Sequence, residues 1–114
     1  MPYLKITTSK SVDAETKHRI LTATSKEVAA ALEKPESYMM VSLEGAVPMV
    51  FGGTQELCAF LELRGIGLPK AKTGKLSQLL CQMVESQLGV NKKRVYINFT
   101  DVPTNLWGWN GNTF

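Results

Sequence analysis

The chain has 114 residues, of which 44% are hydrophobic and 20% charged, and its formal net charge is +3. These values are typical of a soluble protein with one core of ordinary size, and no apolar run is long enough to cross a membrane. The basic residues form no continuous stripe, and the triplet Lys92–Arg94 is expected to be solvated surface charge, which argues against nucleic-acid binding.

The two cysteines and the single histidine indicate no metal or redox site. Cys58 and Cys81 form no CxxC pair, and no cluster of His, Cys, Asp and Glu has the spacing of metal ligands. The first residues lack the charged start and apolar stretch of a signal peptide. We therefore expect a cytoplasmic protein with reduced cysteines and neither a metal nor a membrane as partner.

Residues 1–56 are predicted to form a strand, a helix and a second strand. Residues 3–7 alternate apolar and polar side chains, as in a strand with one buried face. Asp13 is placed to cap a helix that starts at the next residue, and Lys34-Pro35 is expected to end it. Residues 38–43 are predicted as the second strand and 49–51 as a short one. The helix carries the apolar stripe Ile20, Leu21, Thr24, Val28, Ala31 and Leu32.

Residues 57–114 repeat this order. Strands are predicted at 57–63 and 95–99, with a short strand within 106–109, and Gly89 lies where the cap of the intervening helix belongs. That helix carries the apolar stripe Leu76, Leu79, Leu80, Met83, Val84 and Leu88. We therefore expect one α/β (α+β) domain over residues 1–114, with pseudo-repeats of about 1–56 and 57–114. Its two βαβ repeats would form a four-stranded mixed sheet with two helices on one face.

Such a sheet would leave one face without cover. Residues 38–43 and 57–63 are apolar on both faces, whereas two helices cover only one. A monomer would then expose a large apolar patch and unpaired edge strands. A closed homo-oligomer is expected, and the alternative is a monomer whose own tail covers the second face.

Pro2 is a candidate catalytic group because Met1 before a small residue is usually removed. Removal would leave a proline with a secondary amine at the N-terminus. An α-amine titrates near ~7.7–8.0, and desolvation lowers that pKa further. A proline nitrogen surrounded by apolar side chains would therefore be neutral near physiological pH and could act as a base. The alternative is that Pro2 only stiffens the start of the chain.

Several short stretches are each a weak indication of a family. Their order and spacing along the whole chain make the indication specific. The stretches are Pro2, Lys34-Pro35 followed by Tyr38, residues 51–54 (FGGT), Ile66-Gly67, residues 94–99 (RVYINF), and residues 108–111 (GWNG) with Phe114. With these stretches the chain resembles the macrophage migration inhibitory factor family of the tautomerase superfamily.

The resemblance implies a homotrimer whose sheets surround a channel and whose active sites lie between neighbouring subunits. It implies a keto–enol tautomerase, a phenylpyruvate tautomerase-type isomerase, that acts on phenylpyruvate-type 2-keto acids and on dopachrome-like compounds. No cofactor or metal is implied. The expected partners are therefore an aromatic keto acid and further copies of the same chain.

By the same resemblance, three residues act on the reacting part of the substrate. Pro2 is the general base that moves a proton between carbon and oxygen. Lys34 pairs with the substrate carboxylate, which suits a flexible cation. Ile66 offers its backbone N–H to a carboxylate or enolate oxygen. Without the resemblance, Lys34 is simply a cation at a helix end.

Five further residues are implied as substrate-binding residues. Tyr96 and Asn98 share one face of a strand and would reach into the site of a neighbouring subunit. Tyr38, Trp109 and Phe114 would be the aromatic walls of the pocket. Without the resemblance, Tyr96, Asn98 and Trp109 are ordinary strand or core residues.

The chain also departs from the pattern of the family that it resembles. The mammalian cytokine has a CxxC pair where this chain reads Cys58-Ala59-Phe60-Leu61, so thiol–disulfide chemistry by that route is not expected. Trp107 replaces a small aliphatic residue beside the pocket, and it either faces solvent or narrows the site. Because the family includes signalling proteins without secretion signals, the alternative is a cytokine-like binding protein with vestigial activity, exported by a non-classical route.

Overall fold

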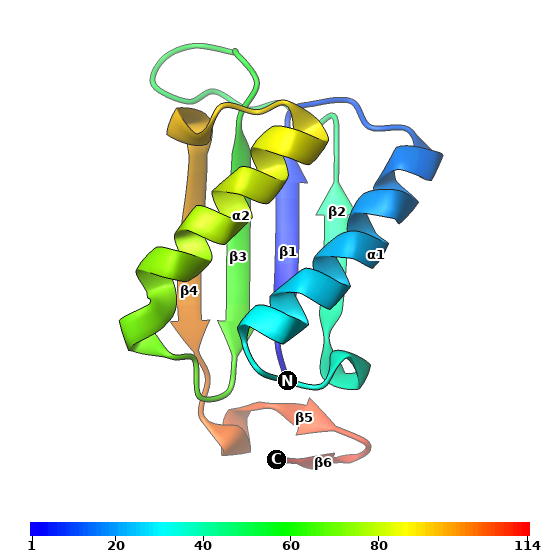
Figure 1. The fold of residues 1–114 in the computed structure, drawn as a ribbon, viewed down its shortest axis with the longest axis vertical. Helices are drawn as coiled ribbons and strands as arrows, with labels where there is room; N and C mark the ends of the chain where they lie inside the picture. The colour runs from blue at the N-terminus through cyan, green and yellow to red at the C-terminus, as the bar shows by residue number, and fades with distance from the viewer.

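Two βαβ units share one four-stranded sheet. In the computed structural model, which describes residues 1–114, the strand order is β2-β1-β3-β4. β1 pairs in parallel with β2 and antiparallel with β3, and β3 pairs in parallel with β4. Both helices lie across one face of the sheet (Figure 1), so the predicted fold class is confirmed. The elements are β1 (Tyr3–Thr8), α1 (Ala14–Ala31), β2 (Met40–Glu44), β3 (Ala59–Gly65), α2 (Thr73–Leu88), β4 (Val95–Asp101), β5 (Gly108–Trp109) and β6 (Asn112–Thr113).

The core lies between the two helices and the sheet. Along the central strands β1 and β3, alternate side chains point to the helices, and those at 4, 6, 61 and 63 are at most 2% exposed. They meet one stripe from each helix, at spacings of three and four residues. The helix side of the core comprises Ile20, Val28, Leu32, Leu76, Leu80, Val84 and Leu88. Neither helix has the length and apolar character that a membrane-spanning segment needs.

Two predicted helix ends agree with the structure. The Asp13 carboxylate accepts a hydrogen bond from the Thr16 N–H at 2.7 Å, and α1 starts at the next residue after this cap. Gly89 caps α2 in the left-handed region, with φ 68°, and its N–H donates to the Glu85 carbonyl at 3.0 Å. Only glycine adopts this backbone geometry without strain from a Cβ atom.

Substituting Gly89 therefore tests the cap directly. No atom lies within 4 Å of a Cβ built at this position, so Gly89→Ala changes backbone strain and not packing. We expect the free energy of unfolding to fall by about 1–2 kcal/mol, the cost of a left-handed residue with a Cβ. Urea denaturation measures it. Gly89→Asn should cost less than Gly89→Ala, because asparagine tolerates this region; equal losses would contradict the strain argument.

The β2 region differs from the sequence prediction. Pro35 opens a single 3-10 turn (Glu36–Tyr38), which removes Tyr38 from the strand, and the Tyr38 N–H donates to the Pro35 carbonyl at 3.1 Å. The predicted strand at 49–51 is absent, because glycines at φ 60° and 80° turn the chain directly back after Phe51. β3 is displaced by two residues, to Ala59–Gly65. These three strands were predicted from apolar content, whereas turn geometry decides where strands end.

The uncovered face of the sheet is mostly polar, so the expectation of a large apolar face is wrong. In β2, Val41 and Leu43 pair with the buried residues Leu4 and Ile6 of β1, so they face α1 and the core. Ser42 and Glu44 therefore face away. The uncovered face carries polar side chains on every strand: Lys5, Thr7, Ser42, Glu44, Glu62, Arg64, Asn98 and Thr100.

Large apolar side chains are instead exposed at the two ends of the sheet. One end holds the N-terminus and the β5–β6 hairpin, and the other holds the loop between β2 and β3 (Figure 1). The exposed side chains at the first end are Tyr38, Met40, Leu106 and Trp109, and at the second end Val50, Leu57 and Tyr96. The molecule therefore has two different apolar ends joined by a polar face.

Candidate functional site

Pro2 lies at the start of β1, buried between two cavities. Its carbonyl accepts a hydrogen bond from the Met40 N–H at 3.0 Å, which fixes the residue against β2. A small cavity of about 10 Å³ lies on one side, with Lys34 and Ile66 in its wall. A larger one of about 340 Å³ lies on the other, and aromatic side chains line it. Pro2 therefore lies between a small, mostly apolar cavity that has Lys34 as its one charged residue and a larger aromatic one.

The end of α1 positions Lys34. Glu33 is left-handed with φ 55°, its N–H donates to the Ala30 carbonyl at 3.1 Å, and the Lys34 N–H donates to the Ala29 carbonyl at 3.0 Å. These two bonds form a Schellman motif, which ends the helix three residues before the predicted Lys34. The Glu33 carboxylate pairs with Lys72 at 3.3 Å. None of the ion pairs involves Lys34, so its ammonium group is available to an anion.

Ile66 contributes a free backbone donor. It lies in the turn after β3, which the Leu68 N–H secures by donating to the Asp101 carboxylate at 3.1 Å. No hydrogen bond in the structure uses the Ile66 N–H. A backbone donor without a partner beside a cavity is unusual. The Ile66 N–H is therefore free to donate to another group.

Three of the five aromatic residues that line the larger cavity contact one another. The Tyr38 ring meets the Trp109 ring edge-on, with centroids 5.7 Å apart. Trp109 and Phe114 stack with an interplanar angle of 10° and centroids 5.5 Å apart. The Phe114 N–H donates to the Trp107 carbonyl at 3.2 Å, which closes the hairpin under these rings. Residues distant in sequence thus form one aromatic box next to Pro2.

The N-terminal amine is in a desolvated and positive environment. Burial is the main cause that lowers the pKa of the Met1 amine from its ordinary value, and the nearby charge of Lys34 lowers this pKa further. Both effects disfavour the protonated amine. An amine at this place is therefore neutral over a wider pH range than an exposed N-terminus.

Comparisons with known proteins identify the family of this chain. A family model described as macrophage migration inhibitory factor (MIF) matches residues 1–114. The chain belongs to the MIF family, within the tautomerase superfamily. It is 35% identical, over 100% of its length and 99% of the relative's, to a macrophage migration inhibitory factor homolog of Brugia malayi.

Solved structures of MIF proteins share the fold. The structure of a MIF homologue from Prochlorococcus marinus matches with a TM-score of 0.94 and 41% identity, over 98% of each chain. A Toxoplasma gondii MIF structure matches with a TM-score of 0.91 and 32% identity, over 98% of this chain and 99% of that one.

The structure does not bring Tyr96 and Asn98 to Pro2 within one MIF chain. Tyr96 pairs with Phe60, which pairs with Thr7, four positions along β1 from Tyr3. Tyr96 is therefore about 13 Å from Tyr3 along the strands. It is also about 10 Å away across the sheet, because β3 lies between β1 and β4. Asn98 also lies on the uncovered face and accepts a hydrogen bond from the Thr100 hydroxyl at 3.2 Å. Of the eight predicted site residues, these two do not line the Pro2 cavities.

The cavity wall also contains residues outside the predicted site set. Ser37, Met39 and Met40 line the aromatic cavity because Pro35 starts a turn there. Trp107, the departure from the MIF pattern, is half-buried and also lines this cavity. Its place in the cavity wall rules out a side chain that only faces solvent. The Pro35 turn was the one available signal for the first three residues.

Proposed function

We propose that this MIF-family chain is a cofactor-free tautomerase of phenylpyruvate-type 2-keto acids, with the Pro2 nitrogen as general base. The observation that carries the proposal is the position of Pro2 between two groups of residues. On one side lie Lys34, which has no ion-pair partner, and Ile66, whose N–H is free; on the other lies the aromatic box. An aromatic 2-keto acid has the matching shape, with a carboxylate at one end and a ring at the other.

The reaction requires that Met1 be removed, since only then does Pro2 carry a basic nitrogen. The nitrogen lone pair takes a proton from the carbon next to the ketone. The C–H electron pair becomes the C=C bond, and the carbonyl π electrons move to oxygen. The proton is then delivered to that oxygen, which gives the enol. Burial and the Lys34 charge lower the pKa of the Met1 amine, and the same surroundings are expected to favour the neutral Pro2 amine that the first step needs.

Lys34 and Ile66 are proposed to hold the acid and the developing negative charge. The ammonium of Lys34 pairs with the carboxylate, and the Ile66 N–H donates to the carboxylate or enolate oxygen. A fixed donor where charge develops stabilises the transition state more than the ground state. The aromatic box holds the ring and excludes water from the amine.

Tyr96 and Asn98 are proposed to serve the Pro2 site of a neighbouring copy. Contact between the two different apolar ends of successive copies is a head-to-tail interface, which makes a ring when its rotation closes. A ring of three copies, the assembly that the family resemblance implies, would place the Tyr96 end of one chain against the Pro2 end of the next.

The proposal is tested by intact mass and by turnover of phenylpyruvate and p-hydroxyphenylpyruvate on the same preparation. Mass spectrometry shows whether Met1 is absent, and absorbance follows the enol. Protein without Met1 that turns over both acids supports the proposal. Protein without Met1 that turns over neither contradicts it, and favours a signalling or binding role for the same scaffold.

Trp107 is expected to limit the size of the ring that the site accepts. Trp107→Val should enlarge the aromatic cavity and raise kcat/KM for an indole-bearing 2-keto acid relative to phenylpyruvate by about tenfold, in the range of pocket-size discrimination. Kinetics with both acids measure this ratio. Leu106→Val, at an exposed neighbour outside the cavity, is the control and should leave the ratio unchanged. An unchanged ratio in Trp107→Val would refute the size limit.

A further inference from the structure

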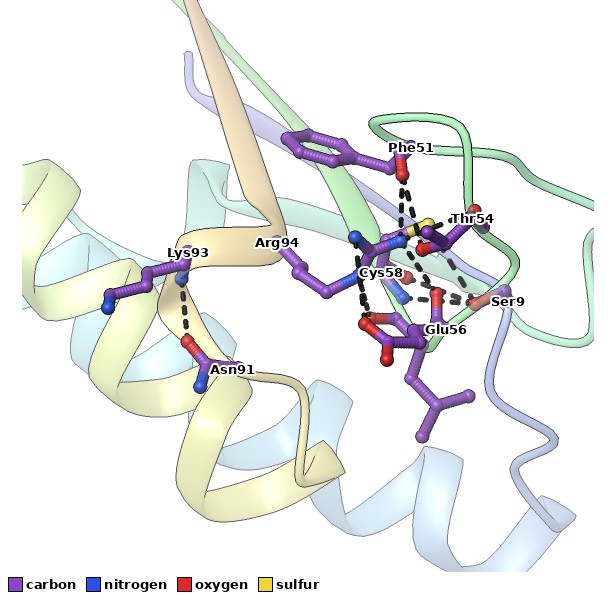
Figure 2. A network of polar contacts seen from close by, with 9 residues as sticks. Ser9, Phe51, Thr54, Glu56, Cys58, Asn91, Lys93 and Arg94 are labelled. Carbon is purple, nitrogen blue, oxygen red and sulfur yellow. Dashed lines mark hydrogen bonds and ion pairs between the residues drawn. The ribbon is translucent and has the colours of Figure 1, made fainter.

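Arg94 is not the solvated surface charge that its basic triplet predicts. Its side chain is 16% exposed. The guanidinium donates to the carbonyls of Leu57 at 3.1 Å, Phe51 at 3.1 Å and Glu56 at 3.0 Å, and more weakly to that of Thr54 at 3.4 Å. Figure 2 shows these bonds converging from one loop onto one side chain.

This loop depends on Arg94. Before this loop, the Val47 N–H donates to the Thr8 carbonyl at the end of β1, and the Ala46 N–H donates to the Lys10 carbonyl just beyond it. After the loop, the Cys58 N–H donates to the Ser9 hydroxyl. Between these points, the only hydrogen bonds from residues 48–57 to the rest of the chain are those that Arg94 donates. The remaining bonds of the segment, between Phe51 and Thr54, are internal.

The same side chain supports the Tyr96 ring. The Arg94 Cζ atom lies 5.0 Å from the centroid of the Phe51 ring, a cation–π contact. The Phe51 ring in turn lies 4.7 Å from the Tyr96 ring, at 55°. Tyr96 is otherwise 65% exposed. The three side chains form a column that fixes the direction of an exposed aromatic group.

We propose that Arg94 is a positioning residue that acts in trans: it holds loop 48–57 and, through Phe51, orients Tyr96 for the Pro2 site of a neighbouring copy. This inference rests on the proposed function, which assigns Tyr96 to that site. The role requires arginine, because only a planar guanidinium reaches several carbonyls and stacks on a ring at once. Lysine keeps the charge and lacks this geometry.

Arg94→Lys tests the proposal, with Lys93→Gln as the control on an adjacent residue whose side chain makes no such bonds. Arg94→Lys should be cleaved several-fold faster by chymotrypsin after Phe51 or Leu57. Its kcat/KM for phenylpyruvate should fall by about 10- to 100-fold, the effect of a small misplacement of a binding group. Lys93→Gln should match the wild type in both assays.

Co-expression with Pro2→Gly separates action in trans from a defect in the chain's own fold. In mixed trimers, the Pro2 of an Arg94→Lys chain meets the intact loop of a Pro2→Gly chain. Random pairing makes about a quarter of the sites complete, so activity should rise well above that of either variant alone. Absence of rescue in isolated mixed trimers, or wild-type kinetics in Arg94→Lys, would overturn the proposal. A wild-type protein without turnover would overturn the proposed function and the catalytic part of this inference, whereas proteolysis would still decide whether Arg94 holds the loop.

Discussion

Replacing Pro2 with Gly is expected to lower kcat/KM for phenylpyruvate by about 10²- to 10⁴-fold, the range that a positioned general base contributes. Glycine is small enough for Met1 to be removed as well, so both proteins start with a free amine. The substitution removes the secondary amine and the ring that fixes it. The Pro2 carbonyl bond to Met40 is a backbone contact and remains available.

The pH dependence of the wild-type enzyme gives a second measure of the same base. Burial and the Lys34 charge lower the pKa of the Met1 amine, and we expect the same surroundings to lower the pKa of the Pro2 amine once Met1 is removed. Since the neutral amine is the active form, kcat/KM should rise with pH through that lowered pKa. It should level off below the pH at which an ordinary α-amine loses its proton.

A chain with alanine inserted between Met1 and Pro2 is the sharper variant. It keeps every side chain of the site and converts the proline nitrogen to an amide. Its activity should be at least as low as that of Pro2→Gly. If the insertion variant, with its added residue verified by mass, keeps wild-type turnover, Pro2 is not the base.

The helices and their caps were the most predictable part of the fold. The apolar stripes and the caps at Asp13 and Gly89 are local signals, and the structure agrees with them. Strand ends were less predictable, because the turn after Pro35 and the two glycines after Phe51 override apolar content. The polarity of the open face follows from a register that apolar content does not specify.

The site was predictable only through family resemblance. Pro2, Tyr38, Trp109 and Phe114 come from distant parts of the chain, and no spacing rule brings them together. The role proposed for Ile66 uses its backbone N–H, so its side chain carries no signal. Arg94 belongs to a basic triplet typical of solvated charge. Its partners are backbone carbonyls, which every residue carries, so the sequence does not indicate these contacts.

Lys34→Gln is expected to affect both binding and the basicity of the amine. A hydrogen bond to a charged group contributes about 1.5–3 kcal/mol. Loss of the carboxylate partner should therefore lower kcat/KM for phenylpyruvate by about 10- to 100-fold, mainly through a higher KM. Because the Lys34 charge lowers the pKa of the N-terminal amine, its removal should also move the inflection of the pH profile to higher pH.

These two effects distinguish Lys34 from a lysine that only ends a helix. Lys26→Gln removes the same charge from an exposed position on α1 and should change neither KM nor the pH profile. A keto compound that lacks the carboxylate offers no partner to Lys34, so the wild type and Lys34→Gln should bind it with similar KM. Equal losses of kcat/KM for the acid and for this neutral analogue would show that Lys34 supports the shape of the site and does not bind the carboxylate.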